Sequence, residues 1–186
     1  MGLAQFALRK QALSLRSVGL SRPTVYHVLL GIALGLGMAF GIFWFGAAEQ
    51  RLFQWLLPPA TFQSLLISTN RASAEQAFKQ LHYAFPMMLF ALLGSVVAPI
   101  GEEVLFRGML YTTLKRRVRA GSLMPLIISA LLFALIHASP LHLIPLFLMG
   151  LGFAIAYERS GSLWVPILMH AVNNGVTFLM LALAAS

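Results

Sequence analysis

Two adjacent glutamates and one arginine lie inside the apolar run APIGEEVLFRGML, residues 98–110. Glu103 and Arg107 are four residues apart with the acidic residue first, which is the favourable order for an ion pair on a helix. We therefore expect Glu103 to be neutralised by Arg107. Glu102 points to another face of the helix, which leaves its carboxylate available for chemistry.

Two histidines and an asparagine in later apolar runs are the natural partners of Glu102. His170 and Asn174 are four residues apart and share one helix face, and Phe133 and His137 have the same spacing. A carboxylate beside an imidazole can deprotonate water, and a second imidazole with an amide can donate hydrogen bonds to a developing oxyanion. We expect these residues to form one polar site, with Phe133 packed beside it.

The same side chains could instead hold a metal ion. Two histidines and a glutamate, here His137, His170 and Glu102, are three plausible ligands for Zn²⁺ and would leave one position open for water. The residue types do not choose between water activated by a divalent metal such as zinc and water activated by the carboxylate.

Several protease classes are excluded by residues that the sequence lacks. The chain has no cysteine and no aspartate, which rules out a thiol nucleophile, a disulfide framework and an aspartyl dyad. It also has no H-E-x-x-H motif, which the helix of a zinc metalloprotease would carry.

The elements that must position these residues are membrane helices. The 186 residues are 59% hydrophobic and 10% charged, whereas a soluble domain has roughly a quarter charged residues. We predict an all-α, polytopic bundle of five or six transmembrane helices. The apolar stretches cover about 25–47, 82–115, 122–138, 141–157 and 162–184.

Three further features refine this division of the chain. Residues 1–24 read as a basic amphipathic segment at the membrane surface, followed by a single transmembrane domain over 25–186. Residues 48–80 read as an exposed connection with short helices, and it is open whether they re-enter the membrane and whether Pro99 breaks the second span. The first span carries two small-xxx-small pairs, which allow another helix to approach closely: Gly31 with Gly35, and Gly37 with Gly41.

The distribution of basic residues predicts the orientation of the chain. Cytoplasmic segments of membrane proteins are enriched in Lys and Arg. With the N-terminus in the cytoplasm, ten basic residues fall inside and three outside, or nine against three if Arg107 is buried. We expect a multi-pass protein of the cytoplasmic membrane of a cell, in contact with lipids and not with nucleic acid. The three outside residues are Arg51, Arg71 and Lys79.

The polar residues also fall at similar depths. A rise of about 1.5 Å per residue, counted from the basic side, places Glu102 about 20 Å deep and His137 about 22 Å deep. The same count places His170 and Asn174 about 12 and 18 Å deep. Because a buried charge is costly in a membrane, this coincidence favours a shared functional site over isolated polar residues.

Three motifs in this order resemble the CAAX-protease and bacteriocin-processing (CPBP, or Abi) family of intramembrane proteases. They are E-E-x-x-x-R at residues 102–107, F-x-x-x-H at 133–137 and H-x-x-x-N at 170–174. The resemblance covers about residues 82–180, which would form the protease-like core. It implies an intramembrane endopeptidase acting on a peptide or membrane-protein substrate.

By this resemblance, Glu102 and His137 would activate water, and His170 and Asn174 would stabilise the oxyanion. Glu103 and Arg107 would support the site. The family is described both as metal-dependent and as glutamate-dependent, so the resemblance leaves cofactor use open. Two alternatives also remain: a catalytically silent member that acts as an immunity or scaffold protein, and a proton-coupled transporter. The substrate, the cleavage position and the oligomeric state are not indicated by the sequence.

Overall fold

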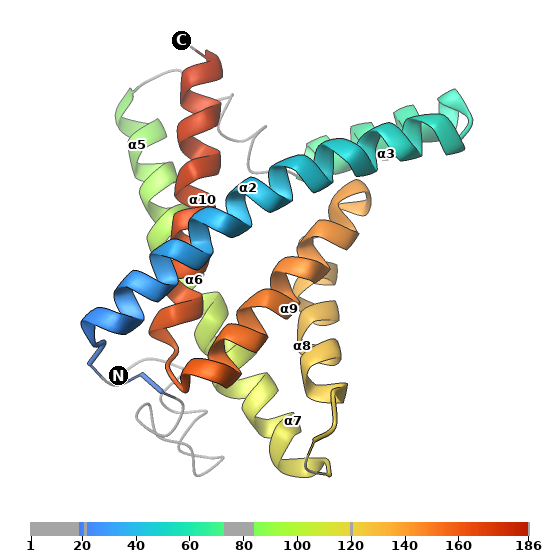
Figure 1. The fold of residues 1–186 in the computed structure, drawn as a ribbon. Helices are drawn as coiled ribbons and strands as arrows, with labels where there is room; N and C mark the ends of the chain where they lie inside the picture. Colours follow the sequence, from blue (N-terminus) through green and yellow to red (C-terminus); the bar gives the residue numbers. More distant parts are fainter. Residues whose placement is uncertain (1–18, 21, 73–83, 120, 186) are drawn as a thin grey trace.

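The structure, a computed structural model, describes residues 19–20, 22–72, 84–119 and 121–185 (Figure 1). The amphipathic segment predicted over residues 1–24 therefore lies largely outside the described residues. The described part of the chain is helical throughout its regular elements, which confirms the prediction of an all-α membrane bundle.

The first helix, α2 (Val25–Leu56), is longer than the predicted span. Thr24 begins it with a capping box that involves the side chain of His27. We expected an exposed connection from residue 48, but the helix continues until Leu57, which is extended because a proline follows it. A second helix, α3 (Pro59–Ala72), then occupies much of that region. The predicted exposed connection with short helices was therefore wrong for residues 48–56, which continue α2, whereas the 14-residue helix α3 is consistent with it.

The segment that carries the glutamates is one continuous helical run. It consists of α5 (Ala84–Leu92), η1 (Leu93–Val97), α6 (Ala98–Glu103), η2 (Val104–Tyr111) and α7 (Thr112–Arg117), where η1 and η2 are π-helical. Pro99 lies within α6 and does not break the run. A proline cannot donate to the carbonyl one turn earlier, and the π-helical segment before it accommodates that missing bond.

The remaining helices follow the predicted order. They are α8 (Met124–Ile136), the short 3₁₀ helix η3 (Pro140–His142), α9 (Leu143–Ser160) and α10 (Trp164–Ala185). Gly161 ends α9 in the left-handed conformation, at φ 65°, and turns the chain into α10. In the described residues four helical runs are long and apolar enough to cross a membrane, and α8 is an apolar helix of shorter length.

Close helix approaches fix the bundle around α10. A Cβ atom on Gly31 would lie 2.7 Å from Leu168 Cβ, and one on Gly35 would lie 2.8 Å from Val172 Cβ. The first predicted glycine pair thus packs α2 against α10, which cross in Figure 1. A Cβ atom on Gly37 or Gly41, the second pair, would meet no other described element within 4 Å, so this pair does not serve the contact.

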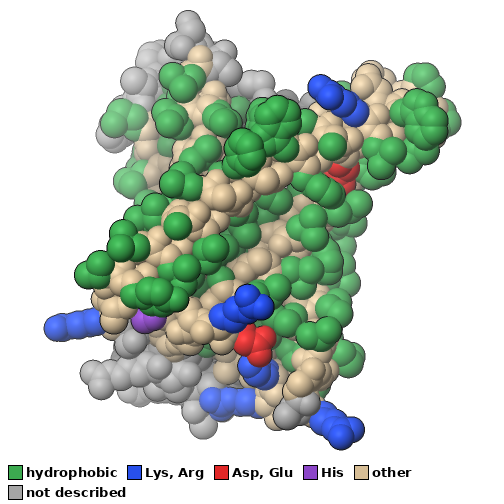
Figure 2. Space-filling view, in the orientation of Figure 1, with side chains coloured by type: hydrophobic (Ala, Val, Ile, Leu, Met, Phe, Trp, Pro, Cys, Tyr) green, Lys and Arg blue, Asp and Glu red, His purple; other side chains and the backbone are tan. Residues whose placement is uncertain are grey.

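Basic side chains gather at one end of the molecule. Figure 2 shows Lys and Arg where α2 begins and where α9 ends, below a broad apolar surface. An apolar belt with a charged rim is the surface expected of a protein embedded in a bilayer.

Candidate active site

The ion pair between Glu103 and Arg107 lies at the centre of the bundle. Both side chains are fully buried, and Arg107 Nη1 donates to Glu103 Oε1 at 2.9 Å. Arg107 Nη2 donates to the carbonyl oxygen of Gly150 on α9 at 2.9 Å. The guanidinium also faces the rings of Phe133 and Phe153, at 4.8 and 5.2 Å from their centroids. The predicted pair is therefore present, and it ties η2 to α9.

Glu102 lies between the two histidines. Its Oε2 atom is 3.9 Å from His137 Nε2 and 4.0 Å from His170 Nε2. Glu102 and His137 are partly accessible, with 28% and 30% of their side chains exposed, whereas His170 is 3% exposed. Among the described residues, Glu102 Oε2 has no hydrogen-bond partner. His137 and His170 follow Glu102 by 35 and 68 positions in the chain, and both thus approach Glu102 Oε2. The similar membrane depths estimated from the sequence predicted this meeting.

The other ring nitrogen of each histidine is held by a hydrogen-bond partner. His137 Nδ1 lies 2.7 Å from the carbonyl oxygen of Phe133, and His170 Nδ1 lies 3.1 Å from Glu103 Oε1. A carbonyl and an ionised carboxylate only accept hydrogen bonds, so we assign a hydrogen to Nδ1 in both rings. In the neutral rings the Nε2 lone pairs then face Glu102.

Aromatic rings enclose the buried side of the site. Phe153 stacks on His170 with centroids 4.8 Å apart and an interplanar angle of 22°. Phe133 lies 4.7 Å from the His137 ring and 5.7 Å from the His170 ring. Phe133 therefore packs beside the site as predicted, and the two phenylalanines limit the rotation of both imidazoles.

Asn174 forms its hydrogen bonds outside the cluster of Glu102, His137 and His170. Its Nδ2 donates to the carbonyl oxygen of Gly94 in η1 at 3.0 Å, and its Oδ1 accepts from Asn173 Nδ2 at 3.3 Å. Among the described residues no hydrogen bond joins Asn174 to Glu102 or to either histidine. An amide nitrogen carries two hydrogens, so one donor of Asn174 remains beyond the bond to Gly94.

A sequence profile identifies the family of this chain. The profile of the type II CAAX prenyl endopeptidase Rce1-like family matches residues 84–176, which is 93 of 186 residues. The chain belongs to this family. The matched range contains every residue of the site described above.

Two curated relatives of this CAAX-endopeptidase family member are named as a membrane peptidase and a membrane-embedded protease. The chain is 33% identical over 108 residues to the putative membrane peptidase YdiL of Bacillus subtilis, covering 56% of this chain and 41% of the relative. It is 33% identical over 92 residues to the membrane-embedded CAAX protease MroQ of Staphylococcus aureus, covering 47% of this chain and 37% of the relative. The alignments thus span about two fifths of each relative. No solved structure matches the chain.

The donor atoms of this family member are spaced more widely than the ligands of a metal ion. Ligands at about 2.0–2.1 Å from a tetrahedral zinc lie roughly 3.3 Å from one another, whereas Glu102 Oε2 lies 3.9 and 4.0 Å from the two histidines. Within the described ranges, no three His, Asp or Glu side chains are arranged to hold a metal. As placed, these atoms do not match the spacing of tetrahedral zinc ligands.

Four features of this candidate site were not predicted from the sequence. They are the contact of Glu103 with His170, the ring of Phe153, and the carbonyl oxygens of Gly150 and Gly94. Gly150 and Phe153 are three residues apart on α9 and so share a face, which is a signal the sequence does contain. The contacts of the Gly150 and Gly94 carbonyl oxygens could not be predicted from residue types, because every residue has a backbone carbonyl.

Proposed function

We propose that this protein is an intramembrane endopeptidase that hydrolyses a peptide bond with Glu102, His137, His170 and Asn174. The convergence of two histidine Nε2 atoms on the unpartnered Glu102 Oε2 carries this proposal. The names of the relatives, a membrane peptidase and a membrane-embedded CAAX protease, support it. Its substrate would be a peptide or a membrane protein.

The separations within the site suit a bridging water molecule. Distances of 3.9 and 4.0 Å are too long for direct hydrogen bonds, but polar groups separated by more than about 3.5 Å are commonly bridged by water. A water at this point can donate one hydrogen to Glu102 Oε2 and the other to His137 Nε2. Both acceptors would polarise it for attack.

In the reaction, Glu102 acts as the general base and then as the acid. It takes a proton from water while the water oxygen bonds to the carbonyl carbon of the substrate, which gives a tetrahedral oxyanion. The carbon–nitrogen bond then breaks, and the proton passes from Glu102 to the leaving amine. The products are a carboxylic acid and an amine, and the carboxylate of Glu102 is restored.

His170 and Asn174 would stabilise the oxyanion. Nδ1 of His170 faces Glu103, so donation from Nε2 requires a ring that carries hydrogens on both nitrogens. The second N–H of Asn174 provides another donor. Donors of this kind are positioned before the negative charge develops, so no reorganisation is needed during the reaction, and acyl transfer is accelerated.

We further infer that the basic end of the molecule faces the cytoplasm in a cytoplasmic membrane. The segment before α8, the start of α2 and the end of α9 carry basic side chains at this end (Figure 2), whereas Arg51 lies near the other end of α2. This arrangement follows the enrichment of Lys and Arg in cytoplasmic loops.

The decisive experiment compares the wild-type protein with Glu102→Gln, purified in detergent, on a library of membrane-protein peptides. Mass spectrometry would identify cleavage products, and a thermal unfolding curve would verify folding. Glu158→Gln is the matched control, because Glu158 is a partly exposed glutamate that pairs with Lys115 away from the site. We expect products from the wild type and the control, and a loss of at least about 10²-fold in Glu102→Gln.

Two outcomes would redirect the proposal. Equal product sets from the wild type and a folded Glu102→Gln would reject catalysis at this site, and would favour an immunity or scaffold role for the fold. Loss of activity in a chelator, restored by zinc, would show that the site closes around a metal. Activity that survives chelation would support water activation by Glu102 and His137 without a metal.

A further inference from the structure

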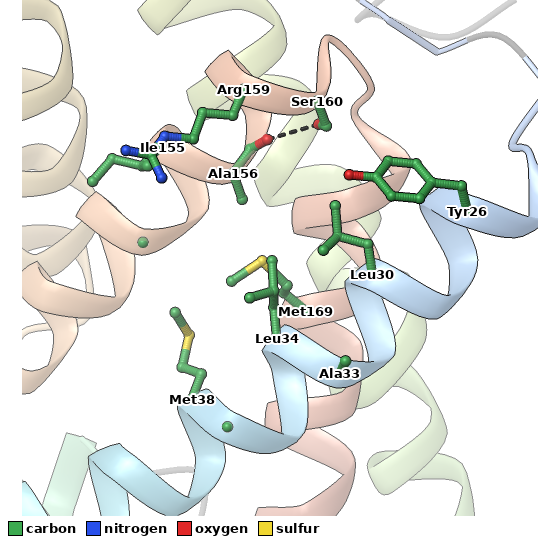
Figure 3. Close-up of a pocket in the computed structure, with 12 residues that line it drawn as sticks. Tyr26, Leu30, Ala33, Leu34, Met38, Ile155, Ala156, Arg159, Ser160 and Met169 are labelled. Atoms are coloured by element: carbon green, nitrogen blue, oxygen red, sulfur yellow. Dashed lines mark hydrogen bonds between the residues drawn. The ribbon is translucent and has the colours of Figure 1, made fainter.

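A groove separate from the candidate active site runs between α2 and α9, with α10 as its floor. Its cavity volume is about 570 Å³, within the range of small-molecule sites. Neither glutamate of the site, nor His137, His170 or Asn174, lines it. Figure 3 shows its walls and floor. The apolar side chains that line it include Leu30, Leu34, Met38, Ile155, Ala156 and Met169.

Two glycines keep the groove hollow. Gly37 on α2 and Gly152 on α9 both line it. A Cβ atom on Gly37 would meet nothing within 4 Å, and one on Gly152 would meet only the flexible end of Met38, at 2.5 Å. Larger side chains at these positions would occupy the space between the helices.

One end of the groove is polar and lies at the basic end of the molecule. Tyr26, in the first turn of α2, and Arg159, in the last turn of α9, are labelled on opposite walls in Figure 3. Among the described ion pairs, none joins Arg159 to a carboxylate. Tyrosine and arginine at this level of a membrane protein lie beside lipid headgroups, and arginine binds phosphate oxygens in pairs.

The length of the groove matches one leaflet. Tyr26 and Met38 are twelve residues apart, which corresponds to about 18 Å along the helix. The hydrocarbon core is about 30 Å thick, so one leaflet is about 15 Å deep. An acyl chain that enters between α2 and α9 can therefore lie along the groove while its headgroup stays beside Arg159.

We propose that this groove binds one anionic phospholipid, with its phosphate on Arg159 and an acyl chain over Met169. The apolar length accounts for the chain, and the unpaired cation at the mouth accounts for the negative headgroup. Because Met169 precedes His170, and Gly152 precedes the Phe153 ring that stacks on His170, the bound lipid would line the back of the site. The lipid site goes beyond the proposed function and does not depend on it.

Native mass spectrometry of the full chain tests this proposal. The protein would be equilibrated in detergent with equal amounts of palmitoyl-oleoyl phosphatidylglycerol and phosphatidylethanolamine, and the retained lipid would be weighed. We expect one phosphatidylglycerol on the wild type. Arg159→Gln should lower the preference for phosphatidylglycerol by about five-fold, the effect of one basic side chain at an anionic surface. Gly37→Phe should remove lipid of both kinds.

Two matched controls separate the groove from general effects. Gly41→Phe places the same ring one turn further along α2, at a residue that does not line the groove and where an added Cβ atom would meet no other described element within 4 Å. Arg116→Gln removes an exposed charge from the same end of the molecule. Both should retain lipid like the wild type.

Three results would overturn the proposal. An equal loss of preference for phosphatidylglycerol in Arg116→Gln and Arg159→Gln would reduce the effect to overall charge. Lipid retained by Gly37→Phe at the wild-type level would place the bound lipid outside the groove. A wild-type dimer that becomes a monomer in Gly37→Phe would assign the groove to a second copy of the chain. Since the readout is lipid mass, it is independent of proteolysis, and thermal unfolding of each variant verifies its fold.

Discussion

Glu103 holds the imidazole of His170 through Nδ1, at 3.1 Å, on the ring edge that faces away from Glu102. The same carboxylate oxygen accepts a hydrogen bond from Arg107 at 2.9 Å. One fully buried atom thus serves as the anchor of a candidate catalytic ring and as half of an ion pair. Of the two adjacent glutamates, Glu103 therefore lies beside Nδ1 of His170 and Glu102 lies nearer its Nε2.

We expect Glu103→Gln to lower kcat by about 10²-fold or more while KM changes little. The amide can place its nitrogen toward His170 and hold the ring in the wrong tautomer, as happens when the carboxylate of a catalytic triad becomes an amide. Steady-state kinetics on a cleaved peptide would measure the split between kcat and KM.

A double variant provides the control for this role. If Glu103 acts through the ring, Glu103→Gln combined with His170→Gln should lose no more activity than His170→Gln alone. Additive losses would contradict the assignment and would mean that Glu103 contributes independently.

Arg107→Met should destabilise the protein by about 3–5 kcal/mol, because it leaves the buried Glu103 carboxylate without its cation. The unfolding free energy in mixed micelles would measure this. Lys115→Met is the matched control: the Lys115–Glu158 pair is half exposed, and exposed pairs contribute about 1 kcal/mol or less.

Adding Glu103→Leu to Arg107→Met should recover part of the lost stability, since replacing a whole buried pair costs less than breaking it. A double variant as unstable as Arg107→Met would show that packing, not the unpaired charge, is responsible.

Asn174→Ala should reduce kcat by about 10²–10³-fold, the usual effect of removing one oxyanion donor. Asn173→Ala should cost less than about ten-fold, because Asn173 donates to Asn174 Oδ1 and only orients it. The comparison uses the same peptide and conditions for both variants. A larger loss of kcat in Asn173→Ala than in Asn174→Ala would make Asn173 the oxyanion donor and Asn174 the residue that orients it.

Gly31→Ala should destabilise the bundle by about 1–3 kcal/mol, as overpacking does. The added Cβ would lie 2.7 Å from Leu168 Cβ and 3.0 Å from the backbone oxygen of Val165. Gly41→Ala, on the open face of the same helix, should be neutral or stabilising by up to about 1 kcal/mol, because alanine is the better helix former. Equal destabilisation in both variants would argue against the α2–α10 contact.

Local spacing made the ion pair and the helix order predictable. Glu103 and Arg107 lie four apart, and the helical rise fixes how deep each residue lies, so the meeting of Glu102 with His137 and His170 could be expected. Spacing does not specify the rotation of a helix about its own axis. The contact of Glu103 with His170 depends on that rotation, which explains why the sequence assigned Glu103 to Arg107 alone.

Packing against distant helices accounts for the other differences. Phe153 is one apolar residue among many in α9, and only its position opposite His170 distinguishes it. The length of α2 was underestimated because hydropathy falls after Ala47, although no residue that breaks a helix occurs before Pro58.

The π-helical segments on both sides of α6 have a consequence for changes in chain length. In a regular α-helix, deleting one residue turns every later side chain by about 100° relative to the earlier ones. A π-helical turn contains one residue more than an α-helical turn, so a deletion within Leu93–Val97 can convert it to α-helix without reorienting Glu102. A one-residue deletion on either side of α6 can therefore be absorbed without turning the two glutamates away from the site. The described lengths of α9 and α10 contain no π-helical segment, so a deletion there would reorient the side chains that follow it.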